Sequence, residues 1–89
     1  MSYQLTFTDI AKKDIELFKK SGDKSILKKL HKLLIEISEH PMMGTGKPEQ
    51  LKYELSGKWS RKINREHRII YEILEDENQI VIYSTKGHY

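Results

Sequence analysis

Three residues in the second half of the chain could together cleave RNA. Glu49 lies in a loop between Lys47 and Lys52. Arg68 begins an apolar segment, and His88 is the penultimate residue. A carboxylate can take the proton from a ribose 2′-hydroxyl, an imidazole can protonate the leaving 5′-oxygen, and a guanidinium can stabilise the phosphorane between them. These groups predict RNA cleavage without a metal ion if folding brings them together on one face.

Each of these residues also has an ordinary interpretation. A glutamate in a lysine-rich loop most often pairs with a surface cation. Arg68 could pair with Glu66 or Glu54 in the same way. His67 and Arg68 are neighbours in an expected strand, so they would point to opposite faces and at most one would belong to a site. A non-catalytic basic module that binds RNA or the ribosome therefore stays the alternative, although it has no use for a carboxylate and an imidazole together.

The charge of the chain is concentrated in its middle. The 89 residues carry a net charge of +3, and residues 47–68 hold seven Lys or Arg against three Glu. Such a basic region attracts polyanions, although an ordinary solvated surface has the same composition. A chain of this length fits one domain over residues 1–89 with a modest core, so a site would lie at the surface.

The composition excludes several classes of site. Without cysteine the chain has no disulfide, thiolate nucleophile or Cys-based zinc site, and a small unstapled domain is typical of the cytoplasm. The four histidines form no recognisable metal-binding motif, so no metal or cofactor is expected. The N-terminal residues lack the pattern of a signal peptide, and no apolar run exceeds four residues, so no membrane association is expected.

The residue pattern predicts an α+β fold in which one strand and two helices precede a sheet. The first half reads as a strand within residues 3–7, a helix from Thr8 or Asp9 to Gly22, and a second helix that ends at His40-Pro41. The two helices should form a hairpin on an antiparallel sheet of four or five twisted strands.

The second half begins with a loop over residues 41–50, and four strands are expected after it. Their sequences are "KYEL", "KWSRKI", "HRIIYEIL" and "QIVIYS". In the second strand Trp59, Arg61 and Ile63 should share one face. If the last strand pairs beside the strand of Arg68, the end of the chain can reach the surface that carries Arg68.

Several motifs resemble the YoeB/Txe family of bacterial toxins, within the RelE superfamily. They are "GKPEQLK" at 46–52, "LSG" at 55–57, "WSR" at 59–61, "EHR" at 66–68 and the terminal "HY". The resemblance implies a RelE-like fold and a ribosome-dependent endoribonuclease that cuts mRNA in the A site. It also implies that Glu49 is the general base, Arg68 stabilises the scissile phosphate, His88 is the general acid and Tyr89 shapes the site.

The resemblance further implies partners and contact residues. Family members are neutralised by an acidic antitoxin of the YefM/Axe type, and many are homodimers. The basic residues expected to contact rRNA or mRNA phosphates are Lys47, Lys52, Arg61, Lys62 and Arg65. Gly87 stands where the family has a bulkier residue, and we expect it to loosen the chain end before His88.

Overall fold

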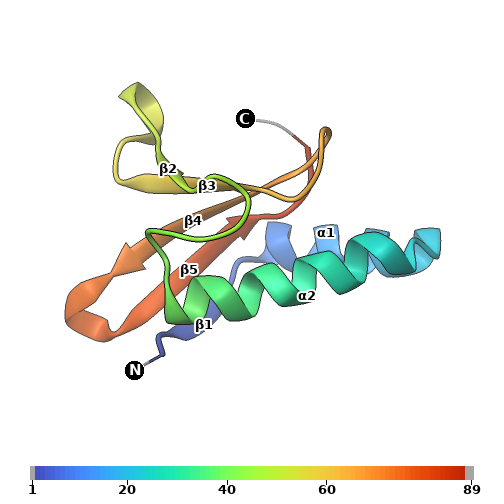
Figure 1. The fold of residues 1–89 in the computed structure, drawn as a ribbon, viewed down its shortest axis with the longest axis horizontal. Coiled ribbons are helices and arrows are strands. Elements are labelled where there is room, and N and C mark those ends of the chain that lie inside the picture. The colour runs from blue at the N-terminus through green and yellow to red at the C-terminus, as the bar shows by residue number, and fades with distance from the viewer. Residues whose placement is uncertain (1, 88–89) are drawn as a thin grey trace.

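Two helices lie across one face of a five-stranded sheet (Figure 1). The computed structural model describes residues 2–87. The elements in chain order are β1 (Gln4–Phe7), α1 (Asp9–Ser21), α2 (Lys24–Glu39), β2 (Glu49–Gln50), β3 (Lys58–Lys62), β4 (Arg68–Leu74) and β5 (Gln79–Ser84), with short 3-10 turns at Tyr53–Leu55 and Glu75–Glu77. The predicted α+β class is confirmed.

The sheet is mixed, and the prediction of a wholly antiparallel sheet was wrong. The strand order is β1-β5-β4-β3-β2. Three strand pairs are antiparallel, namely β2–β3, β3–β4 and β4–β5, whereas β1 runs parallel to β5. The physical reason is that the two helices follow β1 in the chain and separate it from the other strands. β1 therefore joins the edge of the sheet beside β5 through a crossover rather than a tight turn.

Side-chain caps fix the predicted ends of both helices. The Thr8 hydroxyl accepts a hydrogen bond from the Ala11 N–H at 3.1 Å and so begins α1. Gly22 ends it in the left-handed conformation, with φ of 74°. One residue later the Asp23 carboxylate accepts from the Ile26 N–H at 3.1 Å and begins α2. The hairpin therefore needs only two residues between its helices.

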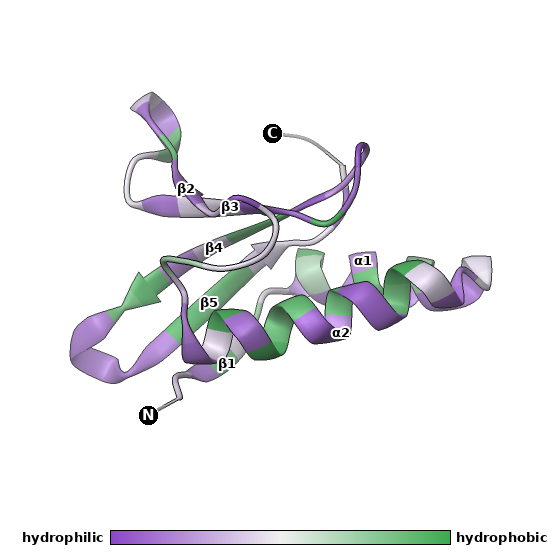
Figure 2. Cartoon of the chain, in the orientation of Figure 1, coloured by the Kyte–Doolittle hydropathy of each residue, from purple (hydrophilic) through white to green (hydrophobic). Residues whose placement is uncertain are grey.

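The core fills the space between the helices and the sheet. Apolar and polar residues alternate along α2, and its apolar side packs on the sheet (Figure 2). The buried members are Ala11, Phe18, Ile26, Leu30, Leu33 and Ile37 from the helices and Ile63, Ile69, Tyr71, Ile80 and Ile82 from the second half of the chain. Neither helix within residues 2–87 is long and apolar enough to cross a bilayer.

The segment "KYEL" is not a strand, which corrects the prediction. The first strand of the second half is instead β2, inside the expected loop, and it pairs Glu49 with Ser60 and Gln50 with Trp59. With Gln50 opposite Trp59, residues 51–58 must reverse the chain. Tyr53 accordingly has a positive φ of 59° and starts a 3-10 turn. Glu49 therefore lies on a two-residue edge strand.

Arg61 is buried, so its prediction as an RNA contact was wrong. Its side chain has 0% exposure and points to the helix side of β3, together with Trp59 and Ile63. Its Nη2 donates to the backbone oxygens of His40 and Met43, both at 2.9 Å. Its Nη1 lies 3.6 Å from Glu36 Oε1 on α2. Arg61 thus holds the loop after α2 instead of facing a phosphate.

Further hydrogen bonds fasten the same loop to the sheet and to α2. The Tyr71 hydroxyl donates to the Pro41 oxygen at 2.6 Å, and the Thr45 N–H donates to Glu36 Oε1 at 2.7 Å. The Thr45 N–H holds the pKa of Glu36 below its usual value, because it stabilises the charged carboxylate. Gly46 has a φ of 88°, and a Cβ there would lie 2.5 Å from the Lys62 oxygen, so only glycine fits.

We expect Arg61→Ala to lower the free energy of unfolding by about 3 kcal/mol or more, because it leaves a cavity and unpaired buried carbonyls. Urea unfolding followed by circular dichroism measures this loss. Lys62→Ala, on the next and exposed position of β3, is the matched control and should change stability by less than about 0.5 kcal/mol. Equal losses in the two variants would contradict the structural assignment of Arg61.

Candidate active site

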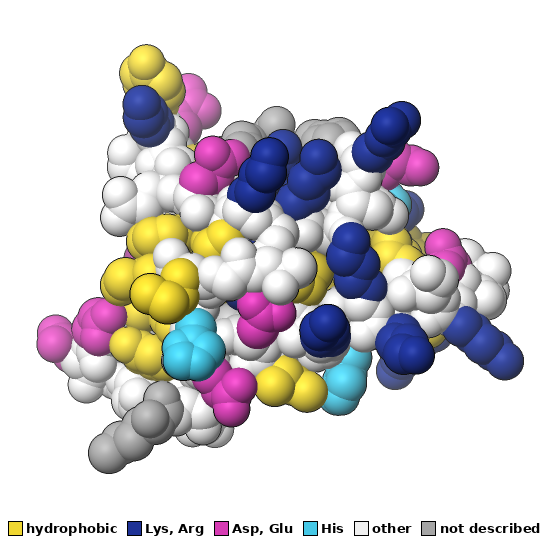
Figure 3. Space-filling view, in the orientation of Figure 1, with side chains coloured by type: hydrophobic (Ala, Val, Ile, Leu, Met, Phe, Trp, Pro, Cys, Tyr) yellow, Lys and Arg dark blue, Asp and Glu magenta, His cyan; other side chains and the backbone are white. Residues whose placement is uncertain are grey.

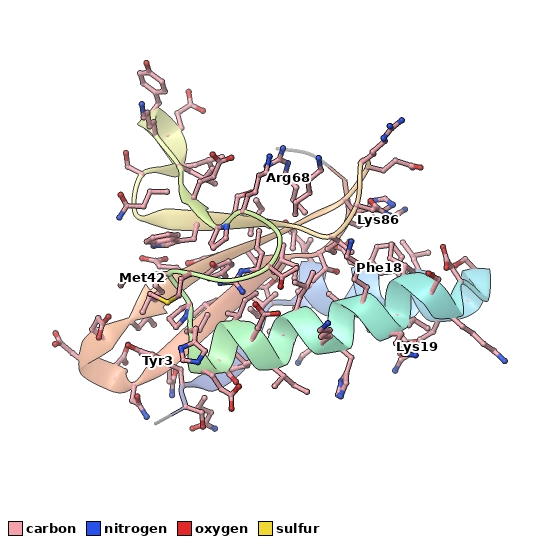
Figure 4. The ribbon with its side chains drawn as sticks, in the orientation of Figure 1. Tyr3, Phe18, Lys19, Met42, Arg68 and Lys86 are labelled. Carbon is pink, nitrogen blue, oxygen red and sulfur yellow. The ribbon has the colours of Figure 1, made fainter. Side chains whose placement is uncertain are left out.

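Glu49 and Arg68 meet on the sheet face that the helices leave open. Arg68 Nη1 lies 3.4 Å from Glu49 Oε1 and 3.3 Å from the Ser60 hydroxyl. The Glu49 side chain is 59% exposed and that of Arg68 is 26% exposed. Figure 4 shows Arg68 on the side of the sheet away from α2. The carboxylate and the guanidinium are therefore both accessible from solvent.

The strand register produces this meeting across three strands. Glu49 of β2 pairs with Ser60 of β3, and Lys62 of β3 pairs with Arg68 of β4. Residues two apart on a strand share a face, so these four side chains lie on the same side of the sheet. Ser60, which sequence reasoning missed, accepts a hydrogen bond from the Arg68 guanidinium and orients it.

The observed ion pair of Arg68 differs from both ordinary pairings expected for it, with Glu66 or Glu54. Its acidic partner is Glu49, whereas Glu66 lies 3.9 Å from the His67 ring. An exposed pair at 3.4 Å stabilises the fold by at most about 1 kcal/mol. The pair is thus too weak to be needed for folding. It also leaves a proton acceptor next to a cation that can hold a phosphate.

A hollow of about 420 Å³ adjoins Glu49 at the edge of the sheet. Its lining residues are Glu49, Gln50, Leu51, Lys52, Tyr53 and Leu55. Lys52 is exposed here, as the sequence-based assignment to RNA contacts requires. The loop that joins β2 to β3 projects beyond the sheet at this point (Figure 1).

A second hollow, of about 450 Å³, gathers basic side chains. Lys47, Lys62 and Arg65, all predicted from the sequence, line it together with Lys29 of α2. Figure 3 shows Lys and Arg side chains gathered over this side of the molecule. Sequence reasoning missed Lys29, although the position of the α2 lysines away from the apolar stripe was a usable signal. We call Lys29, Lys47, Lys62 and Arg65 the basic hollow.

The end of β5 returns to the start of β4, as predicted. The two strands pair antiparallel, and beyond them the Arg68 N–H donates to the Gly87 oxygen at 3.2 Å. The predicted site residues His88 and Tyr89 lie outside the described residues. Gly87 is hydrogen-bonded through both its N–H and its carbonyl. The expected loosening concerns the chain end after Gly87, which likewise lies outside the described residues.

Within residues 2–87, no three His, Cys, Asp or Glu side chains converge as metal ligands would. What the described residues offer is a solvent-accessible carboxylate, a guanidinium oriented by a hydroxyl, and a basic hollow near them. A carboxylate can accept a proton, and a guanidinium can bind a phosphate through two parallel hydrogen bonds. The arrangement suits proton abstraction next to a bound phosphodiester.

Comparison with known proteins gives relatives along the whole length of the chain. A protein from Synechocystis named toxin YoeB is 41% identical over 86 residues, which cover 97% of this chain and 96% of the relative. A solved structure of a YoeB dimer from Staphylococcus aureus has 41% identity and a TM-score of 0.85, with all of both chains covered. A heterotetrameric YoeB-YefM complex from the same organism has 40% identity and a TM-score of 0.84, again with full coverage.

The family assignment rests on nearly the whole chain. Residues 7–89 match the family described as the YoeB-like toxin of bacterial type II toxin-antitoxin systems. This range includes both helices, strands β2 to β5 and every candidate site residue. The chain therefore belongs to the YoeB-like toxins of bacterial type II toxin-antitoxin systems.

Proposed function

We propose that this toxin is a ribosome-dependent, metal-independent endoribonuclease that cuts mRNA in the ribosomal A site and so inhibits translation in the cytoplasm. The observation that carries the proposal is the Glu49 carboxylate beside the Arg68 guanidinium on the open face of the sheet. Gly87, the last residue that the structure describes, accepts a hydrogen bond from the Arg68 N–H. A binding surface alone would need the basic hollow but not this carboxylate.

In the proposed mechanism Glu49 takes the proton from the ribose 2′-hydroxyl, and the freed oxygen attacks the adjacent phosphorus. Arg68 stabilises the extra negative charge of the phosphorane. His88 gives a proton to the leaving 5′-oxygen, and Tyr89 shapes the site around the substrate. The bond that forms joins the 2′-oxygen to phosphorus and the bond that breaks joins phosphorus to the 5′-oxygen. The products are a 2′,3′-cyclic phosphate and a 5′-hydroxyl.

The remaining exposed basic residues, Lys47, Lys52, Lys62 and Arg65, are proposed to bind mRNA or rRNA phosphates. The alternative function is a non-catalytic RNA- or ribosome-binding module that uses the same basic residues without cleavage. For partners, the S. aureus relatives are described as a YoeB-YefM complex and as a dimer. We propose by analogy that an acidic antitoxin of the YefM type neutralises this chain and that the chain dimerises.

We expect Glu49→Gln to slow mRNA cleavage on programmed ribosomes by roughly 10²–10⁴-fold, because the amide keeps the shape but cannot accept the proton. Primer extension after incubation in a translating extract measures the cuts. Glu54→Gln is the matched control on the exposed turn after β2, and it should cleave at the wild-type rate. Full activity of Glu49→Gln would remove Glu49 from the mechanism and favour a different base.

The proposed attack by the 2′-hydroxyl also predicts the chemistry of the cut ends. The upstream fragment should carry a 2′,3′-cyclic or 3′-phosphate, and the downstream fragment a 5′-hydroxyl that polynucleotide kinase labels without prior phosphatase treatment. A substrate with a 2′-deoxyribose at the cut position is the control and should resist cleavage. A 5′-phosphate on the downstream fragment would show that water attacks instead.

Reversing the charge of the basic hollow should weaken ribosome binding. In the double variant Lys62→Glu/Arg65→Glu, the slope of log affinity against log salt should fall by about 0.7 for each phosphate contact that is lost. Lys13→Glu/Lys20→Glu on α1 carries the same charge change on exposed residues and serves as the control. Sedimentation with ribosomes at several salt concentrations measures both. Unchanged binding in the first variant would make the basic hollow an ordinary solvated surface.

A further inference from the structure

The imidazole of His67 binds the backbone just before the chain end. Its Nδ1 accepts a hydrogen bond from the Gly87 N–H at 2.8 Å. The ring lies on the helix side of the sheet, 16% exposed, with its centroid 5.1 Å from that of Phe18 on α1 in an edge-to-face contact. Figure 4 shows Phe18 on the opposite side of the sheet from Arg68. His67 is therefore behind the candidate site rather than in it.

Gly87 is held from two directions by consecutive residues. Its N–H donates to the His67 ring, and its carbonyl accepts from the Arg68 N–H at 3.2 Å. Gly87 has a φ of 80°, which glycine adopts without the steric penalty that other residues incur. With its N–H and its carbonyl both hydrogen-bonded, Gly87 is fixed relative to His67 and Arg68.

From this geometry we infer that His67 is a positioning residue for the C-terminal end of the chain. It anchors Gly87, and through Gly87 it sets the position from which His88 reaches the scissile bond. The inference rests on the proposed function, in which His88 is the general acid. Precise placement matters for such a group, because a shift of about 1 Å in a reacting group can cost up to about 10²-fold in rate.

The hydrogen bond requires one protonation state of the ring. A nitrogen that accepts a hydrogen bond carries no proton, so the neutral ring has its proton on Nε2. Nε2 faces Glu66, whose Oε2 lies 3.9 Å away. His67 and Glu66 line a third hollow, on the helix side of the sheet, whose other charged residues are Asp23 before α2 and Lys86 after β5. A doubly protonated ring would present an N–H to the Gly87 N–H and lose the contact.

Packing alone does not explain a histidine at this position. Phe18 would accept any aromatic ring of similar size in an edge-to-face contact. A phenylalanine lacks the Nδ1 acceptor and therefore cannot bind the Gly87 N–H. An asparagine keeps an acceptor but has no ring: its side-chain oxygen lies at a similar place to Nδ1, and the contact with Phe18 is lost. The two substitutions therefore separate packing from anchoring.

The test compares His67→Phe with His67→Asn on programmed ribosomes. In His67→Phe we expect the maximal rate to fall by about 10-fold or more, up to about 10²-fold, with little change in KM, because the acid is misplaced while binding is retained. His67→Asn should recover most of that rate. His31→Phe, the same change at an exposed position of α2, is the control and should leave the rate unchanged. Wild-type rates in His67→Phe would overturn the inference.

A second measurement reads the contact without cleavage. In the wild-type protein at neutral pH, nitrogen-15 NMR should find the His67 Nδ1 unprotonated and the Gly87 amide protected from exchange. The protection should be lost in His67→Phe and kept in His67→Asn. A protonated Nδ1 in the wild type, or equal protection in both variants, would overturn the inference. If Glu49→Gln and His88→Ala both cleaved normally, the proposed function would fail, while the Gly87 amide would still show whether His67 anchors the chain.

Discussion

The buried guanidinium of Arg61 is the interaction on which the position of the candidate site depends. It binds two backbone oxygens of the loop after α2 and lies beside Glu36, which in turn accepts a hydrogen bond from Thr45 in the same loop. That loop leads directly into β2, whose two residues make the only strand pairing that Glu49 has within the described chain. Because so short a strand cannot hold its own position, the loop must be fixed by contacts beneath it.

Successive residues of β3 point to opposite faces of the sheet, so the side chain that supports the loop is separated from those of the candidate site. Arg61 points inward to the loop, while its neighbours Ser60 and Lys62 lie on the open face with Glu49 and Arg68. One strand thus carries the structural cation on one side and the residue that orients the Arg68 guanidinium on the other. The division is repeated at the start of β4, since His67, just before the strand, contacts Phe18 behind the sheet, while Arg68, its first residue, lies on the open face.

How much the sequence could predict depended on whether a feature was local. Caps and periodicity located both helices, β3, β4 and β5, and the alternation in "KWSRKI" already placed Arg61 with Trp59 and Ile63. Assigning Arg61 to RNA contacts from resemblance ignored that alternation. The parallel pairing of β1 with β5 depends on a partner far away in the sequence, which no local pattern specifies. The strand β2 has only two residues, too few to show an alternating pattern, and it exists through its pairing with β3.

The meeting of Glu49 and Arg68 is likewise non-local, since it spans three strands and nineteen positions of the chain. The resemblance to toxins implied it, but spacing alone could not, because the register of β2 on β3 decides which side chains face each other. The contribution of Lys29 to the basic hollow also depends on tertiary packing, because it follows from where α2 crosses the sheet. The position of Lys29 away from the apolar stripe of α2 indicated exposure, but not which residues would lie beside it.

The exposure of the site explains why the proposed chemistry would require the ribosome. A carboxylate that is 59% exposed and paired with an arginine is well solvated, and water weakens every electrostatic contribution to a transition state. The protein alone has no lid over this face within residues 2–87, because both helices pack on the other side. A large RNA surface seated on the basic hollow would exclude water from Glu49 and Arg68 and supply the burial that a chain of 89 residues cannot. On this argument the small size of the toxin and its proposed dependence on the ribosome have the same physical cause.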